Sequence, residues 1–285
     1  MGIFRRIRAA AAGSLGGQDG PVREAAAHRS NRAASSTSPV VFMHVPKTAG
    51  SSLTNMLVSQ YPPDRVYRPE GRASLSQLQT NELESYQLFC GHFDWSQFKY
   101  LPKTSRVITI LRDPIDRILS LYRYWRSFSW EYAEQRNDFG IQYAKSVGLH
   151  EFFFDAPLGI RANYENAVVR QLVGADFCQP HVGFSLADEQ TVQLAKYRIS
   201  GLAVCGVTDD FQGSSDLIAR CLGLPQLQVR FDNRTRPPDD CNNEAELRNR
   251  VGDALLARLN ALTHLDRQIF QYARAKHRAL VGAPV

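Results

Sequence analysis

The hydrophobic pattern predicts that the first structured element is a short buried strand over residues 40–45, with the sequence Val-Val-Phe-Met-His-Val. Residues 46–50 interrupt this run. Apolar side chains then recur at Leu53, Met56 and Leu57, which is the spacing of one helix face. We therefore expect the folded part of the chain to begin with a strand, a tight loop and a helix.

A second unit has the same order. Residues 106–111, Arg-Val-Ile-Thr-Ile-Leu, are typical of a strand, and Pro114 suits the first position of a helix. An apolar stripe follows, made of Ile115, Ile118, Leu119 and Tyr122. The strand, loop and helix order is therefore expected twice.

The remaining pattern alternates helices and strands. Helices are predicted over residues 74–86, 161–173, 186–197, 209–222 and 244–278, and strands over 88–90 and 202–207. Strands that alternate with helices in this way indicate an α/β fold with a central parallel sheet flanked by helices.

Composition divides the chain into two parts. Residues 1–38 are rich in Arg, Ala, Gly and Ser, so we expect a disordered basic tail there and a single domain over residues 39–285. The tail holds six arginines against Asp19 and Glu24, and it therefore supplies most of the net charge of +6. Because the body is only weakly basic, nucleic acid is not an expected partner.

Other composition signals exclude several classes of protein. The five cysteines are widely spaced without a C-x-x-C pair, and no metal site is expected. Apolar runs are shorter than the roughly 18–20 residues that span a bilayer. The N-terminus lacks the apolar core of a secretory signal, so a cytoplasmic location is expected, with peripheral contact with a membrane left open.

The loop over residues 44–52, His-Val-Pro-Lys-Thr-Ala-Gly-Ser-Ser, suits an anion. Backbone N–H groups at the start of a helix point at a bound phosphate. Gly50 permits close approach, and Lys47 adds a cation. The lysine precedes the glycine, so the order differs from that of a Walker A loop. A plain strand-to-helix turn, capped by Ser51, remains the alternative.

The second segment combines a guanidinium and a hydroxyl. Arg112 follows the predicted strand 106–111 at its carboxyl end, where open α/β sheets bind ligands. Ser120 is predicted on the polar side of the following helix, with Asp116, Arg117 and Arg123. Arg112 and Ser120 could grip one phosphate together. The alternative is a local ion pair between Arg112 and Asp113, with Ser120 an ordinary surface residue.

These two segments, in this order, resemble those of the sulfotransferase superfamily that uses 3′-phosphoadenosine 5′-phosphosulfate (PAPS). The run F-M-H-V-P-K-T-A-G-S-S resembles the family's 5′-phosphosulfate loop, and R-D-P-x-x-R-x-x-S-x-Y its 3′-phosphate motif. The closest branch is that of the uronyl 2-O-type glycan sulfotransferases. Weaker similarity continues through N-A-V-V-R-Q-L-V-G at residues 166–174 and V-T-D-D-F at 207–211.

The resemblance implies a P-loop-like fold and a single sulfotransferase catalytic domain that yields 3′,5′-ADP without a metal. It implies that Lys47 steadies charge on the departing nucleotide, a role consistent with electrostatic stabilisation of a leaving group. The residues implied in donor binding are Lys47, Thr48, Gly50, Ser51, Ser52, Arg112 and Ser120.

A base is also needed to take the proton of an acceptor hydroxyl, and histidine is the usual choice. His92 directly follows the predicted strand 88–90, and Gly91 would let the backbone approach a ligand. A G-H pair at this place supplies the base in uronyl 2-O-type relatives, so the resemblance assigns that role to His92. His44 competes, but its place in a strand favours packing.

The expected function is transfer of the sulfuryl group from PAPS to a hydroxyl acceptor by in-line attack, with a carbohydrate, glycan or glycolipid as the acceptor. Two alternatives remain: a small-molecule kinase that uses ATP, and a non-catalytic protein that binds nucleotides or polyanions. The missing Walker A order counts against the kinase. Retention of both Lys47 and His92 counts against the non-catalytic protein.

Overall fold

The computed structural model describes residues 38–69, 74–179, 183–228 and 244–282. Its centre is a five-stranded sheet in the order β2-β3-β1-β4-β7, in which every neighbouring pair is parallel. The strands are β2 (Val66–Tyr67), β3 (Leu88–Gly91), β1 (Val40–Met43), β4 (Arg106–Leu111) and β7 (Val204–Val207). The predicted α/β class with a central parallel sheet is confirmed.

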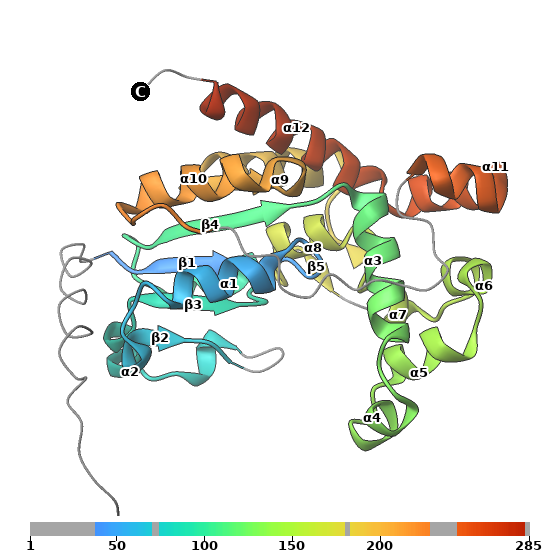
Figure 1. Cartoon of the computed structure of the whole chain (residues 1–285), viewed down its shortest axis with the longest axis horizontal. Helices are drawn as coiled ribbons and strands as arrows, with labels where there is room; N and C mark the ends of the chain where they lie inside the picture. The colour runs from blue at the N-terminus through green and yellow to red at the C-terminus, as the bar shows by residue number, and fades with distance from the viewer. Residues whose placement is uncertain (1–37, 70–73, 180–182, 229–243, 283–285) are drawn as a thin grey trace, which may run out of the picture. The chain divides into compact units, whose positions relative to one another are not determined.

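The strand order places the ends of β1, β3 and β4 together. β1 lies between β3 and β4 (Figure 1), with Met43 paired to Gly91 and Phe42 to Ile108. In the sheet, β3 and β2 lie on one side of β1, and β4 and β7 lie on the other side, so the strand order reverses at β1. Ligands of open α/β sheets bind at such a reversal, beyond the carboxyl ends of the strands.

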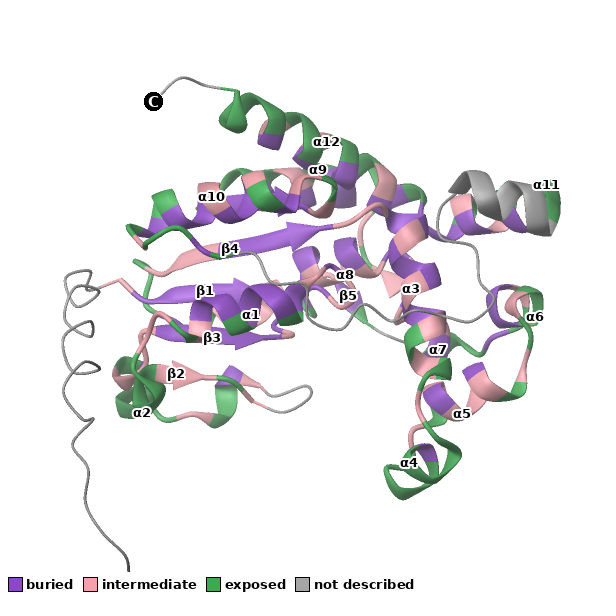
Figure 2. Cartoon of the chain, in the orientation of Figure 1, coloured by how far each residue is buried: buried purple, intermediate pink, exposed green. Residues whose placement is uncertain are grey.

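Helices cover both faces of the sheet. Helices α1 (Gly50–Val58) and α10 (Phe211–Leu222) pack on the face that holds Phe42 and Ile108. The face that holds Met43 packs against α8 (Ala167–Val173), α9 (Asp188–Ser200) and α12 (His264–Val281). Figure 2 shows β1 in the colour of buried residues. Burial on both faces is the reason why these strands are continuous apolar runs.

A second group of helices surrounds α3 (Pro114–Arg126), whose start at Pro114 agrees with prediction. The group includes α4 (Trp130–Gln135), α5 (Phe139–Ser146), α6 (Leu149–Phe154) and α11 (Glu244–Leu262). Ile118 and Tyr122 of α3 share a core with Phe152 of α6 and Leu259 of α11. Helices α4, α5 and α6 were not predicted from the sequence.

Three predicted helices are divided. Residues 74–86 form a 3₁₀ turn, η2 (Leu75–Gln77), and a short helix, α2 (Thr80–Ser85). Residues 161–173 form the end of α7 (Leu158–Arg161) and then α8, because Asn166 adopts a left-handed conformation with φ 45°. The long helix over 244–278 breaks into α11 and α12, and α11 itself is kinked at Gly252, where φ is 74°.

The described residues also include a second, smaller sheet. A two-stranded antiparallel sheet joins β5 (Cys178–Gln179) to β6 (Gly183–Phe184), beyond α8. Residues 1–37 of the predicted tail lie outside the described residues. Among the helices that are described, none combines the length and the apolar character that crossing a membrane requires.

Candidate active site

The loop between β1 and α1 is strongly curled. Lys47 and Ala49 have φ of 70° and 58°, a left-handed conformation that costs about 1–3 kcal/mol for a residue other than glycine. The buried hydroxyl of Thr48 donates to the carbonyl of Val45 at 2.8 Å, which ties the loop to itself. Ala49 occupies the N-cap of α1, where no side chain caps the helix. The capped turn that Ser51 would have made is therefore absent.

Gly50 is required by the imidazole of His44. A Cβ atom at Gly50 would overlap that ring. The ring stacks on Phe42, with 5.4 Å between centroids, and its centroid is 4.4 Å from that of His92. Burial, then the charges of His92 and Lys47, lower the pKa of His44 to about 3. His44 is therefore neutral at physiological pH, which fits the predicted packing role.

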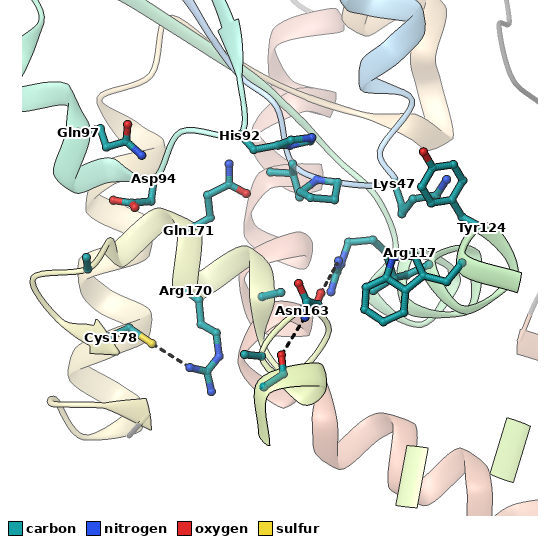
Figure 3. Close-up of a pocket in the computed structure, with 18 residues that line it drawn as sticks. Lys47, His92, Asp94, Gln97, Arg117, Tyr124, Asn163, Arg170, Gln171 and Cys178 are labelled. Carbon is teal, nitrogen blue, oxygen red and sulfur yellow. Dashed lines mark hydrogen bonds between the residues drawn. The ribbon is translucent and has the colours of Figure 1, made fainter. Parts of the chain in front are cut away.

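The orientation of His92 is fixed through the backbone of His44. The Nδ1 atom of His92 is 2.8 Å from the carbonyl oxygen of His44. A carbonyl can only accept, so Nδ1 carries the proton of the neutral ring and Nε2 carries the lone pair. The side-chain amide of Gln171 donates to the same oxygen at 3.1 Å and to the carbonyl of Phe93 at 2.7 Å. Figure 3 shows Gln171 beside His92.

Lys47 lies among other cations. Burial, then the charges of Arg112 and Arg123, lower the pKa of Lys47 to about 8. Its Nζ atom lies 3.7 Å from the centroid of the Tyr124 ring, as Figure 3 illustrates. Cations gathered at the carboxyl edge of a sheet, beside the N-terminus of a helix, have the chemistry to hold a multiply charged anion. The predicted donor segments therefore fit an anionic nucleotide.

Arg112 and Ser120 are both half-buried. Burial lowers the pKa of Arg112, and the charge of Asp116 opposes that effect. The Asp113 carboxylate accepts from the backbone N–H groups of Ile115 and Asp116 at 3.0 and 3.2 Å, and so caps α3. Its principal role is thus to start the helix that carries Ser120.

Arg117 departs from the sequence prediction. It was expected on the polar side of the helix with Ser120, yet it is fully buried. Its guanidinium donates to the carbonyl of Tyr164 at 3.1 Å. Burial lowers the pKa of Arg117, and the charge of the buried Asp266 carboxylate opposes that effect. A guanidinium can be buried when carbonyls and a carboxylate compensate its charge.

Asp266 also explains the turn at Asn166. Its carboxylate accepts from the N–H groups of Val168 and Val169 at 3.3 and 2.8 Å, at the start of α8. The Asn166 side-chain oxygen accepts in return from the N–H of Leu265 at 3.0 Å, at the start of α12. The two helices therefore cap each other, which is why residues 161–173 cannot form one continuous helix.

A cavity of about 570 Å³ opens beside Lys47 and His92. Many of the residues that line it follow β1 and β3 or belong to α3, α7 and α8. The polar and aromatic ones include Lys47, His92, Asp94, Gln97, Arg117, Tyr124, Trp125, Asn163, Arg170 and Gln171. Arg112 and Ser120 are not among its lining residues. The structure thus brings Lys47 and His92 to one cavity and leaves Arg112 and Ser120 outside it.

Sequence reasoning missed several residues of this cavity. Tyr124 and Trp125 extend the helix that carries Ser120, and Gln171 follows the Arg170 of the weakly matching segment. Only their position near matching segments could have drawn attention to them. The contact of Tyr124 with Lys47, and that of Gln171 with the carbonyl that orients His92, depend on tertiary packing.

Comparison with known proteins supports the family resemblance of the two predicted donor segments. A family model described as "Sulfotransferase family" matches residues 33–273. No match was found among curated proteins. The match spans both segments that are predicted to bind the donor, the cavity and the parallel sheet that brings them together. We conclude that the chain belongs to the sulfotransferase family.

Proposed function

We propose that the protein transfers the sulfuryl group of PAPS to a hydroxyl group of an acceptor bound in the 570 Å³ cavity. One observation carries this proposal. Lys47 and His92, which follow different strands, line the same cavity, whereas Arg112 and Ser120 lie outside it. Lys47 would act on the leaving phosphate of the donor and His92 on the acceptor hydroxyl, so both could reach the transferred sulfuryl group from this cavity. Arg112 and Ser120 would then be left for the more distant 3′-phosphate.

The donor side would use the curled loop and the start of α3. PAPS supplies an activated sulfuryl group, and negative charge collects on the leaving phosphate as the bond to sulfur breaks. Lys47 can stabilise that charge, because partial burial strengthens its electrostatic effect. The 5′-phosphosulfate of PAPS would be bound by backbone N–H groups of the loop, at Thr48, Gly50, Ser51 and Ser52. Arg112 and Ser120 would bind the 3′-phosphate, as the family resemblance implies.

His92 is proposed as the base that takes the acceptor's proton. Its Nδ1–H donates to the His44 carbonyl at 2.8 Å, so the neutral ring keeps its lone pair on Nε2. The hydrogen bonds of Gln171 hold that carbonyl in place. A base held in one tautomer and orientation can meet the acceptor hydroxyl at a defined position.

A carbohydrate acceptor of the uronyl 2-O type is the proposed substrate class. Hydrogen-bonding side chains such as Asp94, Gln97 and Asn163 occur on the cavity wall together with the aromatic Trp125. Polar groups on a partly apolar wall suit a hydroxyl-rich ring. The cavity volume of about 570 Å³ lies in the range of small-molecule sites.

The kinase and the non-catalytic alternatives are tested by the same experiment. Purified protein is incubated with ³⁵S-labelled PAPS or γ-³²P-labelled ATP and a panel of glycans, glycolipids and small alcohols. We expect labelled sulfate on a hydroxyl acceptor and no labelled phosphate. Phosphate transfer would favour the kinase, and binding of 3′,5′-ADP without any transfer would favour the non-catalytic protein.

The role of His92 is tested with His92→Ala, and His150→Ala serves as the matched control because His150 is exposed on α6. We expect turnover to fall roughly 10²–10⁴-fold in His92→Ala, the usual contribution of a general base. Affinity for 3′,5′-ADP should stay near that of the wild type. A His92→Ala protein that is folded and keeps more than about a tenth of the turnover would show that another group is the base.

A further inference from the structure

Helix α3 carries side chains for two neighbouring sites. Arg117, Leu121, Tyr124 and Trp125 recur at the spacing of one helix face, and all four line the cavity. Asp116, Ser120 and Arg123 have the same spacing on the adjoining face. Tyr124 is therefore at the boundary between the predicted donor segment and the acceptor cavity.

At this boundary, Tyr124 contacts Lys47 through its ring. The Lys47 Nζ atom is 3.7 Å from the ring centroid, well within the roughly 6 Å over which a cation is attracted to an aromatic face. Burial, then the neighbouring Tyr132, raise the pKa of Tyr124. The phenol is therefore neutral at physiological pH, so Lys47 is held by the ring face rather than by a phenolate.

The ring of Tyr124 is itself held in place. Phe128 packs edge-on against it with 4.8 Å between centroids, and Phe128 stacks on Tyr132 at 4.6 Å with an interplanar angle of 12°. These contacts bring α4 against the end of α3. Because its neighbours fix the ring, Tyr124 presents a defined surface to Lys47.

The charged groups that shift the pKa of Lys47 both disfavour its protonated form. Arg112 at the end of β4 and Arg123 on α3 are cationic, and burial acts in the same direction. The imidazole of His44, after β1, faces Lys47 but is neutral. A long lysine side chain in this setting gains by turning towards solvent or by losing its proton. The face of Tyr124 is a stabilising contact for the ammonium on this wall of the cavity.

We propose that Tyr124 is a positioning residue whose ring holds the ammonium group of Lys47 at the boundary between the donor segment and the acceptor cavity. This proposal rests on the proposed function, because Lys47 is assigned there to the leaving nucleotide. It adds a residue to the site that neither motif contains. The aromatic ring of Tyr124, and not its hydroxyl group, makes the contact with Lys47.

The test compares Tyr124→Phe, which keeps the ring, with Tyr124→Leu, which removes it. Tyr197→Leu is the matched control, because Tyr197 is 77% exposed on α9. The first readout is NMR titration of ¹³Cε-labelled lysine in protein without donor, with the Lys47 signal assigned from its absence in Lys47→Arg. The second is kcat/KM for PAPS between pH 6 and 9.5, which reports groups of the free enzyme.

We expect the Lys47 titration to stay near pH 8 in Tyr124→Phe and in Tyr197→Leu. In Tyr124→Leu it should move down by about 0.5–1.5 pH units, the size of a cation–π contact between its exposed and desolvated limits. The basic limb of kcat/KM should move with it, so that activity at pH 8.5 falls roughly three- to twenty-five-fold. Both shifts together support the proposal.

Other outcomes overturn a definite part of the reasoning. An unshifted Lys47 titration in a folded Tyr124→Leu protein overturns the positioning role, whatever the activity. A shifted titration with unchanged kcat/KM also overturns it, because the contact would then not serve transfer. If Lys47→Ala transfers sulfate as the wild type does, the proposed role of Lys47 fails, while the titration still reports the ring contact.

Discussion

A methyl group at Gly50 should disturb the loop and His92 together. In Gly50→Ala the added Cβ overlaps the imidazole of His44. That ring cannot turn aside freely, because it lies between Phe42 and His92 with centroid separations of 5.4 and 4.4 Å. Overpacking of this kind costs about 1–3 kcal/mol of folding free energy. For a domain of this size, the melting temperature should fall by about 2–4 °C per kcal/mol.

The cause can be isolated by removing the ring. Gly50 is not in the left-handed region, and a glycine at such a position gains about 0.4–1 kcal/mol on conversion to alanine when there is room. In a His44→Ala background, Gly50→Ala should therefore be neutral or stabilising. The double-mutant cycle then has an interaction free energy of roughly 1.5–4 kcal/mol.

The assay is urea denaturation of the wild type, both single variants and the double variant, with sulfate transfer measured in parallel. Turnover of Gly50→Ala should fall, since the His44 carbonyl accepts the hydrogen bond that orients His92. Additive free energies, or a Gly50→Ala protein as stable as the wild type, would refute the steric argument. Loss of stability without loss of turnover would refute the link from His44 to His92.

Three further predictions concern the donor, the pH dependence and the buried carboxylate of Asp266. Arg112→Ala should weaken binding of 3′,5′-ADP about 10–150-fold by calorimetry and leave 5′-AMP almost unaffected, whereas equal losses for both nucleotides would contradict a 3′-phosphate contact. The acidic limb of the pH–rate profile should vanish in His92→Ala and persist in His44→Ala, because the pKa of His44 is already lowered to about 3; a limb that follows His44 would reverse the assignment. Asp266→Ala should lose about 1–3 kcal/mol of stability in urea, since it leaves the buried N–H groups of Val168 and Val169 at the start of α8 without their acceptor; a loss below about 0.5 kcal/mol would show that this carboxylate does not hold α8.

Local sequence determined much of the sheet and its edge. Apolar runs such as residues 40–43 and 108–111 are buried on both faces, so their composition alone indicates parallel strands. Each is followed by a residue type that can bind an anion or exchange a proton. Parallel strands end at one edge, and the sequence was therefore sufficient to predict that Lys47, His92 and Arg112 would gather there.

Tertiary structure decided the parts that depend on contacts between distant residues. Asn166 and Asp266 cap each other's helices from positions 100 residues apart, and no local pattern at Asn166 announces the break that results. Arg117 has the periodicity of a polar face, yet carbonyls and Asp266 compensate its charge inside the protein. Local propensity contains no information about such partners.

The same limit applies to the candidate site. The sequence made Lys47 and His92 candidates because their residue types and neighbours are informative. It could not show that Gln171 holds the carbonyl that orients His92, or that the ring of Tyr124 lies 3.7 Å from the ammonium of Lys47. Side chains on different elements meet only after the helices have packed on the sheet, and that packing sets the distances on which the chemistry depends.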